Sequence, residues 1–454
     1  MKDIENIIIK KLNLSPDDVE SLTPVPSNDG SDNFLLVLKR KDHICPCCGS
    51  VTNKIKDYKP QKIRNKIFSN SNTTVIYRCR RYYCPSCGRS FVEKQTFTGS
   101  RKELSPSIVD QVLKALKPYN STFSSVARQF GLSVTSVIDI FDKHVQMPPN
   151  PLPSVMCWDE FYFNRHVRNK YAFMILNFKN KAIIDILESR KTSFLVDYFF
   201  NINQSERNKV NIIIIDMNDN YRNIANIYFP EAKLCVDSFH ITKYFNDALN
   251  KIRKKIMKRF SSDKTSTQYR LLKYRRYLLF HHQTDIDYVE QHYDRILGYH
   301  STDRNVLSKI LDIDSELNKA YELKERYIDF NTVEEDHFVG LEAKSKELDQ
   351  LIIQCIESNI PQMIRCGKLL ASWYTEILNS FDWIDHRRLS NGPIEGENSY
   401  VKKILGNANG FSNFERARNK IMYSQNHNAT YSIAEHQKPV KRKGKPRGKY
   451  NKNK

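Results

Sequence analysis

The amino-acid sequence predicts a multidomain α+β chain, and three observations lead to this prediction. Two Cys-x-x-Cys motifs lie in a basic N-terminal segment, five short apolar runs follow a proline-rich linker, and about 150 residues beyond them carry helical periodicity alone. The 454 residues suffice for about two to four domains. With 40% hydrophobic and 11% aromatic residues, the composition excludes a disordered chain.

The positive charge of the chain is concentrated in two segments. Lys and Arg number 72 against 51 Asp and Glu, a formal net charge of +21. Residues 40–101 hold 14 basic side chains against 3 acidic ones, and residues 438–454 hold 9 against none. Such clusters bind polyanions by releasing condensed counterions, so we expect a nucleic-acid partner. Apolar stretches stay below the ~18 residues that span a bilayer and the N-terminus lacks a signal core, which predicts an intracellular protein without a membrane partner.

Two motifs of the form Cys-Pro-x-Cys-Gly predict a metal site. Cys45 and Cys48 belong to the first, and Cys84 and Cys87 to the second. Zinc takes four thiolates at tetrahedral corners ~2.3 Å away, and a two-residue spacing directs both thiolates of one motif to the same side of the metal. We therefore predict a structural Zn²⁺ ion in a zinc ribbon over residues 41–100, since four thiolates leave no open position for water.

Other assignments of the thiols remain open at this stage. The 35 residues between Cys48 and Cys84 exceed the common ribbon spacing of ~15–20, so a hairpin or small sheet must fill the gap. Cys47 and Cys79 lie nearby, and either could replace one of the four ligands. Disulfides are the alternative to zinc, but the lack of a secretory signal disfavours them.

Residues 101–147 are predicted to form a helix-turn-helix domain. In TFSSVARQFGLSVTSVIDIFDKH, the spacing of small and apolar side chains closes two helices on each other, with Gly131 at the turn. Ser133 is expected to cap the second helix, whose exposed Thr135 and Ser136 could contact a DNA groove. A plain helical hairpin is the alternative.

After the proline-rich linker, the periodicity changes to that of an α/β core. Five apolar or β-branched runs are typical of strands, with helical stretches between the third and fourth and between the fourth and fifth. Three strands followed by helix, strand, helix and strand is the order expected of a ribonuclease H-like core. The predicted strands are residues 154–158, 171–178, 182–188, 210–215 and 233–236, and the predicted helices are residues 192–201 and 221–228.

Residues 241–390 have no strand signal. So long a segment cannot be a structureless loop inside a compact domain, so we expect an all-helical insertion into the core. Two further helices are predicted after the insertion. The predicted helices of the insertion are residues 241–260, 267–281, 304–328, 340–358 and 361–380, and those after it are 392–405 and 413–425.

Two acids follow strongly apolar runs, where a charge would otherwise be costly. Asp159 follows the first predicted strand and Asp216 the fourth. Two-metal phosphoryl transfer needs several carboxylates that converge on Mg²⁺ or Mn²⁺ ions ~3.5–4 Å apart. The third acid should come from a later helix packed on the sheet, and we assign Glu395, which shares a helical face with Asn398 and Lys402. We expect Asn398 to support the site and Lys402 to lie near a DNA phosphate.

Rival residues remain open on spacing alone. Glu397 lies close to the assigned glutamate but on another helical face, Glu160 is either a supporting residue or a solvated acid, and Asp219 could substitute for the second aspartate. Asp237 and His240 form an Asp-x-x-His string. Such a string can be a metal pair, but it is more often a hydrogen-bonded cap at a strand–helix junction.

Together, these motifs resemble the ISL-three-type insertion-sequence transposases of bacteria. The resemblance covers roughly residues 40–430 and is carried, in order, by CPCCGS, CPSCGRSFVE, the helix-turn-helix, WDEFYF, IIDMNDNY, FPEAKLCVDSFHITKYFNDALNKIR and SNGPIEGENSYVKKI. It implies a DDE transposase whose ribonuclease H-like core is interrupted by a helical insertion before its last acid. By position, Asp159, Asp216 and Glu395 match the catalytic triad, and Asp237 and His240 match a supporting Asp-x-x-His string.

The resemblance also implies a mechanism. The zinc ribbon and helix-turn-helix would bind double-stranded DNA at the terminal inverted repeats of a mobile element. Two divalent ions, bridged by Asp159 and each held by Asp216 or Glu395, would activate water for cleavage, and the freed 3′-hydroxyl would attack target DNA. Paired ends imply a homodimer or higher homo-oligomer, acting on the nucleoid in the bacterial cytoplasm. The predicted domains are residues 1–40 (N-terminal segment), 41–100 (zinc ribbon), 101–147 (helix-turn-helix), 154–240 (core), 241–390 (insertion), 391–430 (last core helix) and 431–454 (basic disordered tail).

Two other functions compete with this one. A transposase-derived regulator that is no longer catalytic would keep the zinc ribbon and helix-turn-helix but would need none of the acids. The presence of all the acids argues against it. A nuclease or resolvase with the same core would cut branched DNA without requiring particular end sequences.

Overall fold

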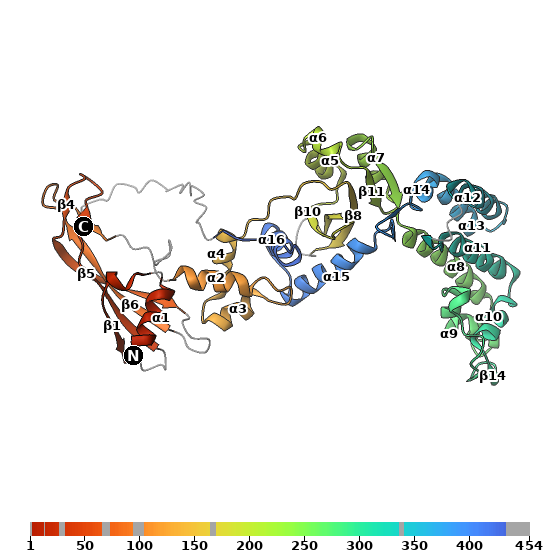
Figure 1. Ribbon diagram of the computed structural model, residues 1–454. Helices are drawn as coiled ribbons and strands as arrows, with labels where there is room; N and C mark the ends of the chain where they lie inside the picture. Colours follow the sequence, from red (N-terminus) through yellow and green to blue (C-terminus); the bar gives the residue numbers. More distant parts are fainter. Residues whose placement is uncertain are drawn as a thin grey trace, which may run out of the picture. The chain divides into compact units, whose positions relative to one another are not determined.

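A computed structural model of the chain describes residues 2–12, 14–26, 32–65, 73–93, 104–163, 169–335 and 340–432 (Figure 1). The chain forms two compact units. The first contains Met1–Pro148 together with Tyr400–Lys454, and the second contains Pro149–Ser399. Within the described residues, every helix is either too short or too polar to cross a membrane. Most of the predicted basic tail lies outside the described residues, which end at residue 432.

A five-stranded sheet forms the N-terminal part of the first unit, covered by helix α1 (Lys2–Lys11). Its central hairpin, β5–β6, fills the long gap between the two cysteine motifs, as expected for a hairpin or small sheet. The sheet also takes in the predicted N-terminal segment, because β2 pairs in parallel with β6. Its strands are β1 (Val19–Val25), β2 (Asp32–Leu38), β5 (Ile55–Asn65), β6 (Thr73–Tyr83) and β7 (Ser90–Val92), and the 3-10 helix η1 (Pro16–Asp18) precedes them.

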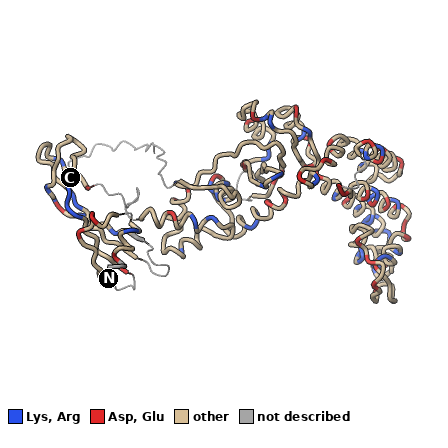
Figure 2. The backbone as a smooth tube through the Cα atoms, in the orientation of Figure 1, with Lys and Arg blue, Asp and Glu red and all other residues tan. Residues whose placement is uncertain are grey.

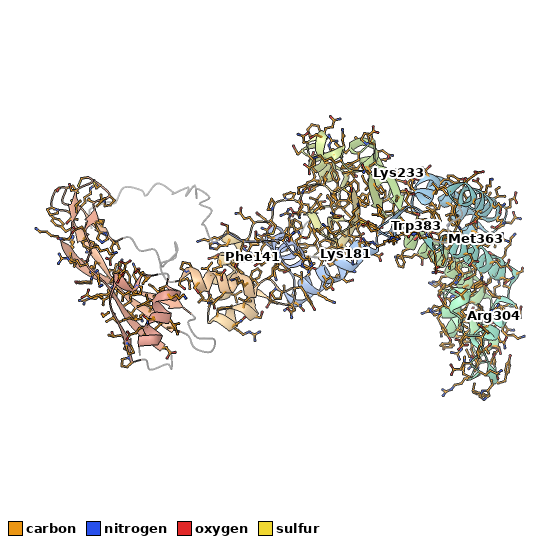
Figure 3. The ribbon with its side chains drawn as sticks, viewed as in Figure 1. Phe141, Lys181, Lys233, Arg304, Met363 and Trp383 are labelled. Atoms are coloured by element: carbon orange, nitrogen blue, oxygen red, sulfur yellow. The ribbon has the colours of Figure 1, made fainter. Side chains whose placement is uncertain are left out.

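The rest of the first unit is helical. Gly131 ends α3 with a φ of 61°, a left-handed conformation that glycine adopts without strain, and Ser133 caps α4 by accepting from the Ser136 amide, as predicted. Phe141, in α4, lies edge-on to Phe123 in the core of this part (Figure 3). The helices are α2 (Pro106–Ala115), α3 (Phe123–Phe130), α4 (Val134–His144) and α16 (Phe414–Gln425), together with the second half of α15 (Gly392–Asn407).

A second five-stranded sheet organises the second unit, in the order β10-β9-β8-β11-β12. β8, β9 and β10 are antiparallel neighbours, whereas β11 runs parallel to both β8 and β12. All five strands overlap the apolar runs that predict them, but β8 continues four residues beyond its run, to Tyr162. They are β8 (Val155–Tyr162), β9 (Tyr171–Asn177), β10 (Ile183–Leu187), β11 (Ile212–Ile215) and β12 (Lys233–Val236), with helices α5 (Thr192–Phe200), α6 (Gln204–Arg207) and α7 (Asp219–Tyr228) between the later strands.

The long segment after β12 is helical for most of its length, but two predicted helices are each split in two. Residues 304–328 divide where Asp314 starts a new helix by accepting from two first-turn amides, and residues 361–380 divide at Trp373. The helices are α8 (Ser238–Arg259), α9 (Thr267–Tyr274), α10 (Asp303–Leu311), α11 (Ser315–Asn331), α12 (Leu341–Ile356), α13 (Pro361–Ser372) and α14 (Tyr374–Asn379), with 3-10 helices η2 (Arg276–Leu279) and η3 (Gln283–Asp285).

The prediction of an all-helical insertion is wrong in two places. β13 (His292–Asp294) pairs with β14 (Tyr299–Ser301), and β15 (Trp383–Ile384) pairs with β16 (Arg387–Arg388). Tight turns close both hairpins, since Gly298 has a φ of 81° and both turn residues of the second hairpin have positive φ. Strands of two or three residues are too short to produce an alternating pattern, which is why the sequence gives no sign of them.

Helices α12 and α13 approach each other closely at Gly367, within the helical group that also contains Met363 (Figure 3). A Cβ atom added at Gly367 would lie 2.9 Å from Cys355 Cβ and 3.1 Å from the Ile352 carbonyl oxygen. Real Cβ atoms do not approach other carbon atoms so closely, so this glycine is required by packing.

We predict that Gly367→Ala lowers the free energy of unfolding by about 1–2 kcal/mol, because the overpacking outweighs the better helix propensity of alanine. Gly406→Ala is the matched control, since its Cβ would meet no described atom within 4 Å. It should leave stability unchanged or raise it. Thermal or urea unfolding of the full chain measures both, and equal stabilisation of the two variants would contradict the packing.

Candidate functional site

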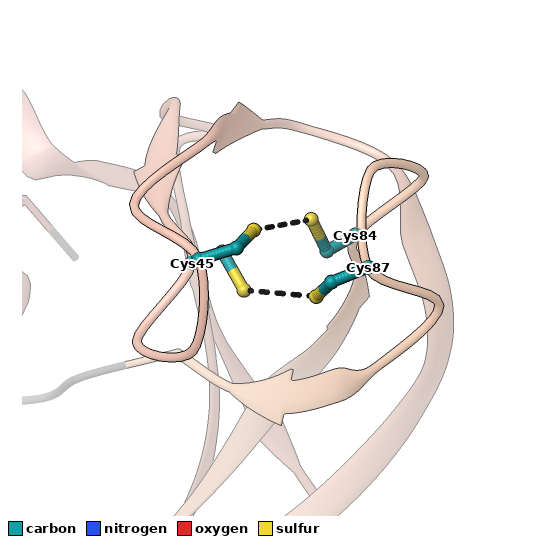
Figure 4. Close-up of side chains that lie close together, drawn as sticks. Cys45, Cys84 and Cys87 are labelled. Atoms are coloured by element: carbon teal, nitrogen blue, oxygen red, sulfur yellow. Dashed lines mark hydrogen bonds between the residues drawn. The ribbon is translucent and has the colours of Figure 1, made fainter.

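The two cysteine motifs face each other and bring four thiols together (Figure 4). Cys45 Sγ lies 3.7 Å from Cys87 Sγ, and Cys48 Sγ lies 3.5 Å from Cys84 Sγ. Four sulfur atoms around one Zn²⁺ ion at about 2.3 Å lie about 3.8 Å apart along each tetrahedral edge. The spacing therefore fits a structural zinc ion held by four thiolates, as predicted.

Both motifs use the same backbone turn to aim their thiols. In the first, the Gly49 amide donates to the Cys45 carbonyl, and in the second, the Gly88 amide donates to the Cys84 carbonyl, each at 2.9 Å. Both glycines have positive φ, 75° and 70°. Backbone amides beside Cys45 lower the pKa of its thiol, which favours the thiolate that zinc requires.

The extra cysteines do not belong to this group of four. Cys79 is fully buried in the core beneath the N-terminal sheet, and Cys47 is exposed. Short strands β3 (His43–Ile44) and β4 (Val51–Thr52) flank the first motif. The remaining four cysteines are buried in the second unit.

Asp159 lies within β8, not after it as the sequence suggested. The strand continues to Tyr162 because β9 pairs with it along its whole length, whereas pairing with β11 stops at Cys157. The side of β8 that faces β11 is therefore open at Asp159. Its Oδ1 accepts from the Glu160 amide at 2.7 Å, and its Oδ2 accepts from the Asn398 side-chain amide at 2.5 Å.

Asp216 directly follows β11, as predicted. Its Oδ1 lies 3.0 Å from Asn391 Nδ2 and 3.1 Å from His240 Nε2. The neighbouring acid, Asp219, is instead exposed in the first turn of α7 and lies 3.7 Å from Arg222. The rival assignment of Asp219 to the site therefore finds no geometric support.

Asp237 follows β12, and its carboxylate lies beside Asp216 and His240. Its Oδ1 accepts from the Asn391 backbone amide at 3.3 Å, and His240 Nε2 lies 3.9 Å from its Oδ2. The potential ligand atoms of Asp216, Asp237 and His240 all lie within 4.8 Å of one another.

Helix α15 supplies the remaining predicted residues. Glu395 lies in its first turn and is exposed, close enough for its charge to raise the pKa of Asp216. Asn398 is buried against Asp159, and Glu397 is half-buried. Lys402 is exposed further along the helix, in the part that belongs to the first unit.

Asn391 was not recognised as a functional residue in the sequence. It is nearly fully buried, and its side-chain amide donates to Asp216 and to the Trp158 carbonyl while its backbone amide donates to Asp237. One residue thereby connects the middle of β8 with the carboxyl ends of β11 and β12. An asparagine just before a helix is most simply interpreted as a cap, so the sequence held no distinguishing signal.

Glu160 occupies a separate position beside the acids. It pairs with Arg190 and accepts from the Tyr221 hydroxyl. The Trp158 ring, two residues earlier on the same face of β8, stacks on Phe199 at 4.9 Å between centroids. Glu160 is therefore bound to neighbours rather than solvated, which agrees with a supporting role.

The carboxylates of Asp159, Asp216 and Asp237 lie close together in a partly buried site. Burial, with the nearby charge of Asp216, raises the pKa of Asp159 to about 7. Burial likewise raises the pKa of Asp216 to about 7, with the Asn391 amide opposing the shift and the charges of Asp237, Glu160 and Glu395 reinforcing it. Burial also raises the pKa of Asp237. Oxygen-rich, mutually repelling acids of this kind fit divalent cations, which would neutralise them.

In the helix pair, Ser133 and Ser136 bind each other, with 2.8 Å between their hydroxyl oxygens. Their hydroxyls therefore serve the helix cap. Within the predicted DNA-contacting set, Ser133 and Thr135 are exposed and Ser136 is half-buried.

Two family models match the chain. One, for the ISL3 group of DDE transposases and described as "Transposase", matches residues 156–421, and the other, described as "zinc-finger of transposase IS204/IS1001/IS1096/IS1165", matches residues 41–87. A curated protein of Bordetella parapertussis, "Transposase for insertion sequence element IS1001", is 20% identical over 250 residues. The match covers 54% of this chain and 60% of that relative, so the chain spans less than two thirds of the relative's length.

We predict that Cys84→Ser abolishes zinc binding and lowers the melting temperature of the first unit, because three thiolates do not complete the tetrahedron. Cys47→Ser, in the opposite motif but outside the group of four, is the matched control. Metal analysis of the purified full chain should give about one zinc per chain for the control and the parent protein. Zinc retained in Cys84→Ser, or lost in Cys47→Ser, would contradict the assignment.

Removing one buried charge should stabilise the metal-free protein. At pH 8, above the raised pKa values, Asp216→Asn keeps an acceptor for Asn391 and removes the repulsion from Asp159. We expect the free energy of unfolding to rise by about 1–2 kcal/mol, or about 2–8 °C in melting temperature, in buffer free of added divalent ions. The exposed Asp219→Asn should change stability little. A destabilised Asp216→Asn protein would show that the carboxylates do not repel one another.

Proposed function

Because the chain belongs to the ISL-three-type transposase family, whose model matches more than half of it, we propose that it cuts and joins DNA as the transposase of an insertion sequence. The observation that carries this proposal is the meeting of acids from separate elements. Asp159 comes from β8, Asp216 from the end of β11 and Glu395 from the first turn of α15. In sequence, 178 residues lie between Asp216 and Glu395.

We assign the second unit a ribonuclease H-like core. Three antiparallel strands followed by two parallel ones, with helices between the later strands, support this assignment. The helical segment between β12 and α15 is then the insertion that precedes the last acid.

In this proposal, Asp159, Asp216 and Glu395 are catalytic residues that hold divalent metal ions. The ions would supply Lewis acidity at the scissile phosphate and a nucleophilic water at neutral pH. Asn391 and Asn398 are positioning residues, since their amides orient carboxylate oxygens of Asp216 and Asp159. Buried asparagine amides bind these acids without adding a competing charge.

The DNA-binding surfaces are proposed in the first unit. Lys and Arg recur along the long β5–β6 hairpin beside the zinc ribbon (Figure 2). Together with the α3–α4 helix-turn-helix, through Thr135, they would bind the terminal inverted repeats. Lys402 would contact a phosphate, and two chains would assemble to hold both ends.

We predict that Asp159→Asn, Asp216→Asn and Glu395→Gln each lower cleavage at the inverted repeats by at least about 10³-fold, because each removes a metal ligand. The assay uses a supercoiled plasmid that carries both repeats from the flanks of the coding region, with Mg²⁺ or Mn²⁺. Repeat binding, measured by mobility shift, should persist in all three variants.

Two control variants make the outcome specific. Asp219→Asn and Glu397→Gln, which change two of the rival acids, should keep most of the cleavage activity. Binding of the repeats without cleavage by the parent protein would favour a regulator that is no longer catalytic. Cleavage of branched DNA without the repeats would favour a structure-selective nuclease.

A further inference from the structure

Asp237 is buried without a full set of partners. Only 2% of the residue is exposed, and its Oδ2 has no hydrogen-bond partner within the part of the chain that the structure describes. A buried carboxylate oxygen left in this way costs free energy unless a cation or donor reaches it. The Oδ2 atom of Asp237 therefore indicates that a ligand binds here.

The simplest structural role for Asp237 would be to cap α8, the helix that it precedes. Its side chain makes no capping hydrogen bond in the described first turn, although the Phe239 amide is near enough to act on its charge. Nor does Arg388 fill the position. Its guanidinium binds Ser380 and Asn331, so it acts on Asp237 only through its positive charge, which opposes the rise in the pKa of Asp237.

The atom that faces the free oxygen is a histidine nitrogen. His240 Nε2 lies 3.9 Å from Asp237 Oδ2 and 3.1 Å from Asp216 Oδ1. Around one ion with ligands at about 2.1 Å, cis ligand atoms lie about 3.0 Å apart and trans ligand atoms about 4.2 Å apart. At this ligand distance, 3.1 Å corresponds to an angle of about 95° at the ion and 3.9 Å to about 136°, so one cation can reach both ligand pairs.

We infer that Asp216, Asp237 and His240 bind one divalent cation, and that the imidazole makes this position favour a transition-metal ion such as Mn²⁺ over Mg²⁺. An imidazole nitrogen is a good ligand for first-row transition metals, whereas Mg²⁺ prefers oxygen alone. The inference deepens the proposed function, because Asp216 is shared with the catalytic acids. It differs from the predicted triad in that Asp237 and His240 become metal ligands.

Asn391 has a defined part in this site. Its backbone amide holds Asp237 Oδ1 and its side chain holds Asp216 Oδ1, which turns the second oxygen of Asp237 toward His240. The site is therefore oriented by a residue that is not itself a ligand, as is common around protein metals.

The test measures Mn²⁺ binding to the full, zinc-loaded chain without DNA. The loss of the free-ion electron paramagnetic resonance signal gives the affinity, and Mg²⁺ competition gives the preference. We expect Mn²⁺ to bind about tenfold or more tightly than Mg²⁺, and His240→Ala and Asp237→Asn each to weaken Mn²⁺ about tenfold or more. The spin-echo spectrum should show coupling to one imidazole nitrogen, absent in His240→Ala.

Controls separate this inference from the proposed function. Asp219→Asn should bind Mn²⁺ as the parent does, and melting curves confirm that each variant folds. Glu395→Gln should lose cleavage but keep the nitrogen coupling. If the parent protein shows the coupling but never cuts DNA, only the proposed function is contradicted. Unchanged Mn²⁺ affinity in both His240→Ala and Asp237→Asn, or no nitrogen coupling in the parent protein, overturns the inference.

Discussion

Mutual repulsion among half-buried carboxylates is the constraint on which the rest of the second unit depends. Burial raises the pKa of both Asp159 and Asp216 to about 7. The charge of Asp216 adds to the shift at Asp159, and the charges of Asp237, Glu160 and Glu395 add to the shift at Asp216. A fold built for stability alone would not gather such groups. A bound cation would neutralise these carboxylates and complete the site. The clustered acids therefore indicate a functional site rather than a role in stability.

The fold brings these groups together by a difference in strand length. β8 extends beyond the end of its pairing with β11, so Asp159 sits beside the open end of the neighbouring strand, where Asp216 follows. Helix α15 comes from far along the chain. Asn398, within this helix, binds Asp159, and Asn391, just before its first residue, binds Asp216. Two amides thus replace the water that would otherwise solvate the carboxylates.

The sequence predicts the sheet better than it predicts the site. Each strand of the second unit is a buried apolar run, a signal that depends on local composition, and Asp216 could be assigned because it ends such a run. Asp159 was expected after a strand and lies inside one, because the extra residues of β8 pair only with β9. Asn391 could not be found at all, since its role depends on three distant strands and its position imitates a helix cap.

The most direct test of the central claim is anomalous diffraction from crystals of the full chain bound to its DNA ends and soaked in Mn²⁺. The account predicts a peak within about 2.5 Å of carboxylate oxygens of Asp216, with Asp159 and Glu395 around the same small volume. Absence of any peak there, with the Asp159 and Glu395 carboxylates held more than about 10 Å apart on the bound DNA, would contradict it and leave a protein that binds DNA without cutting it.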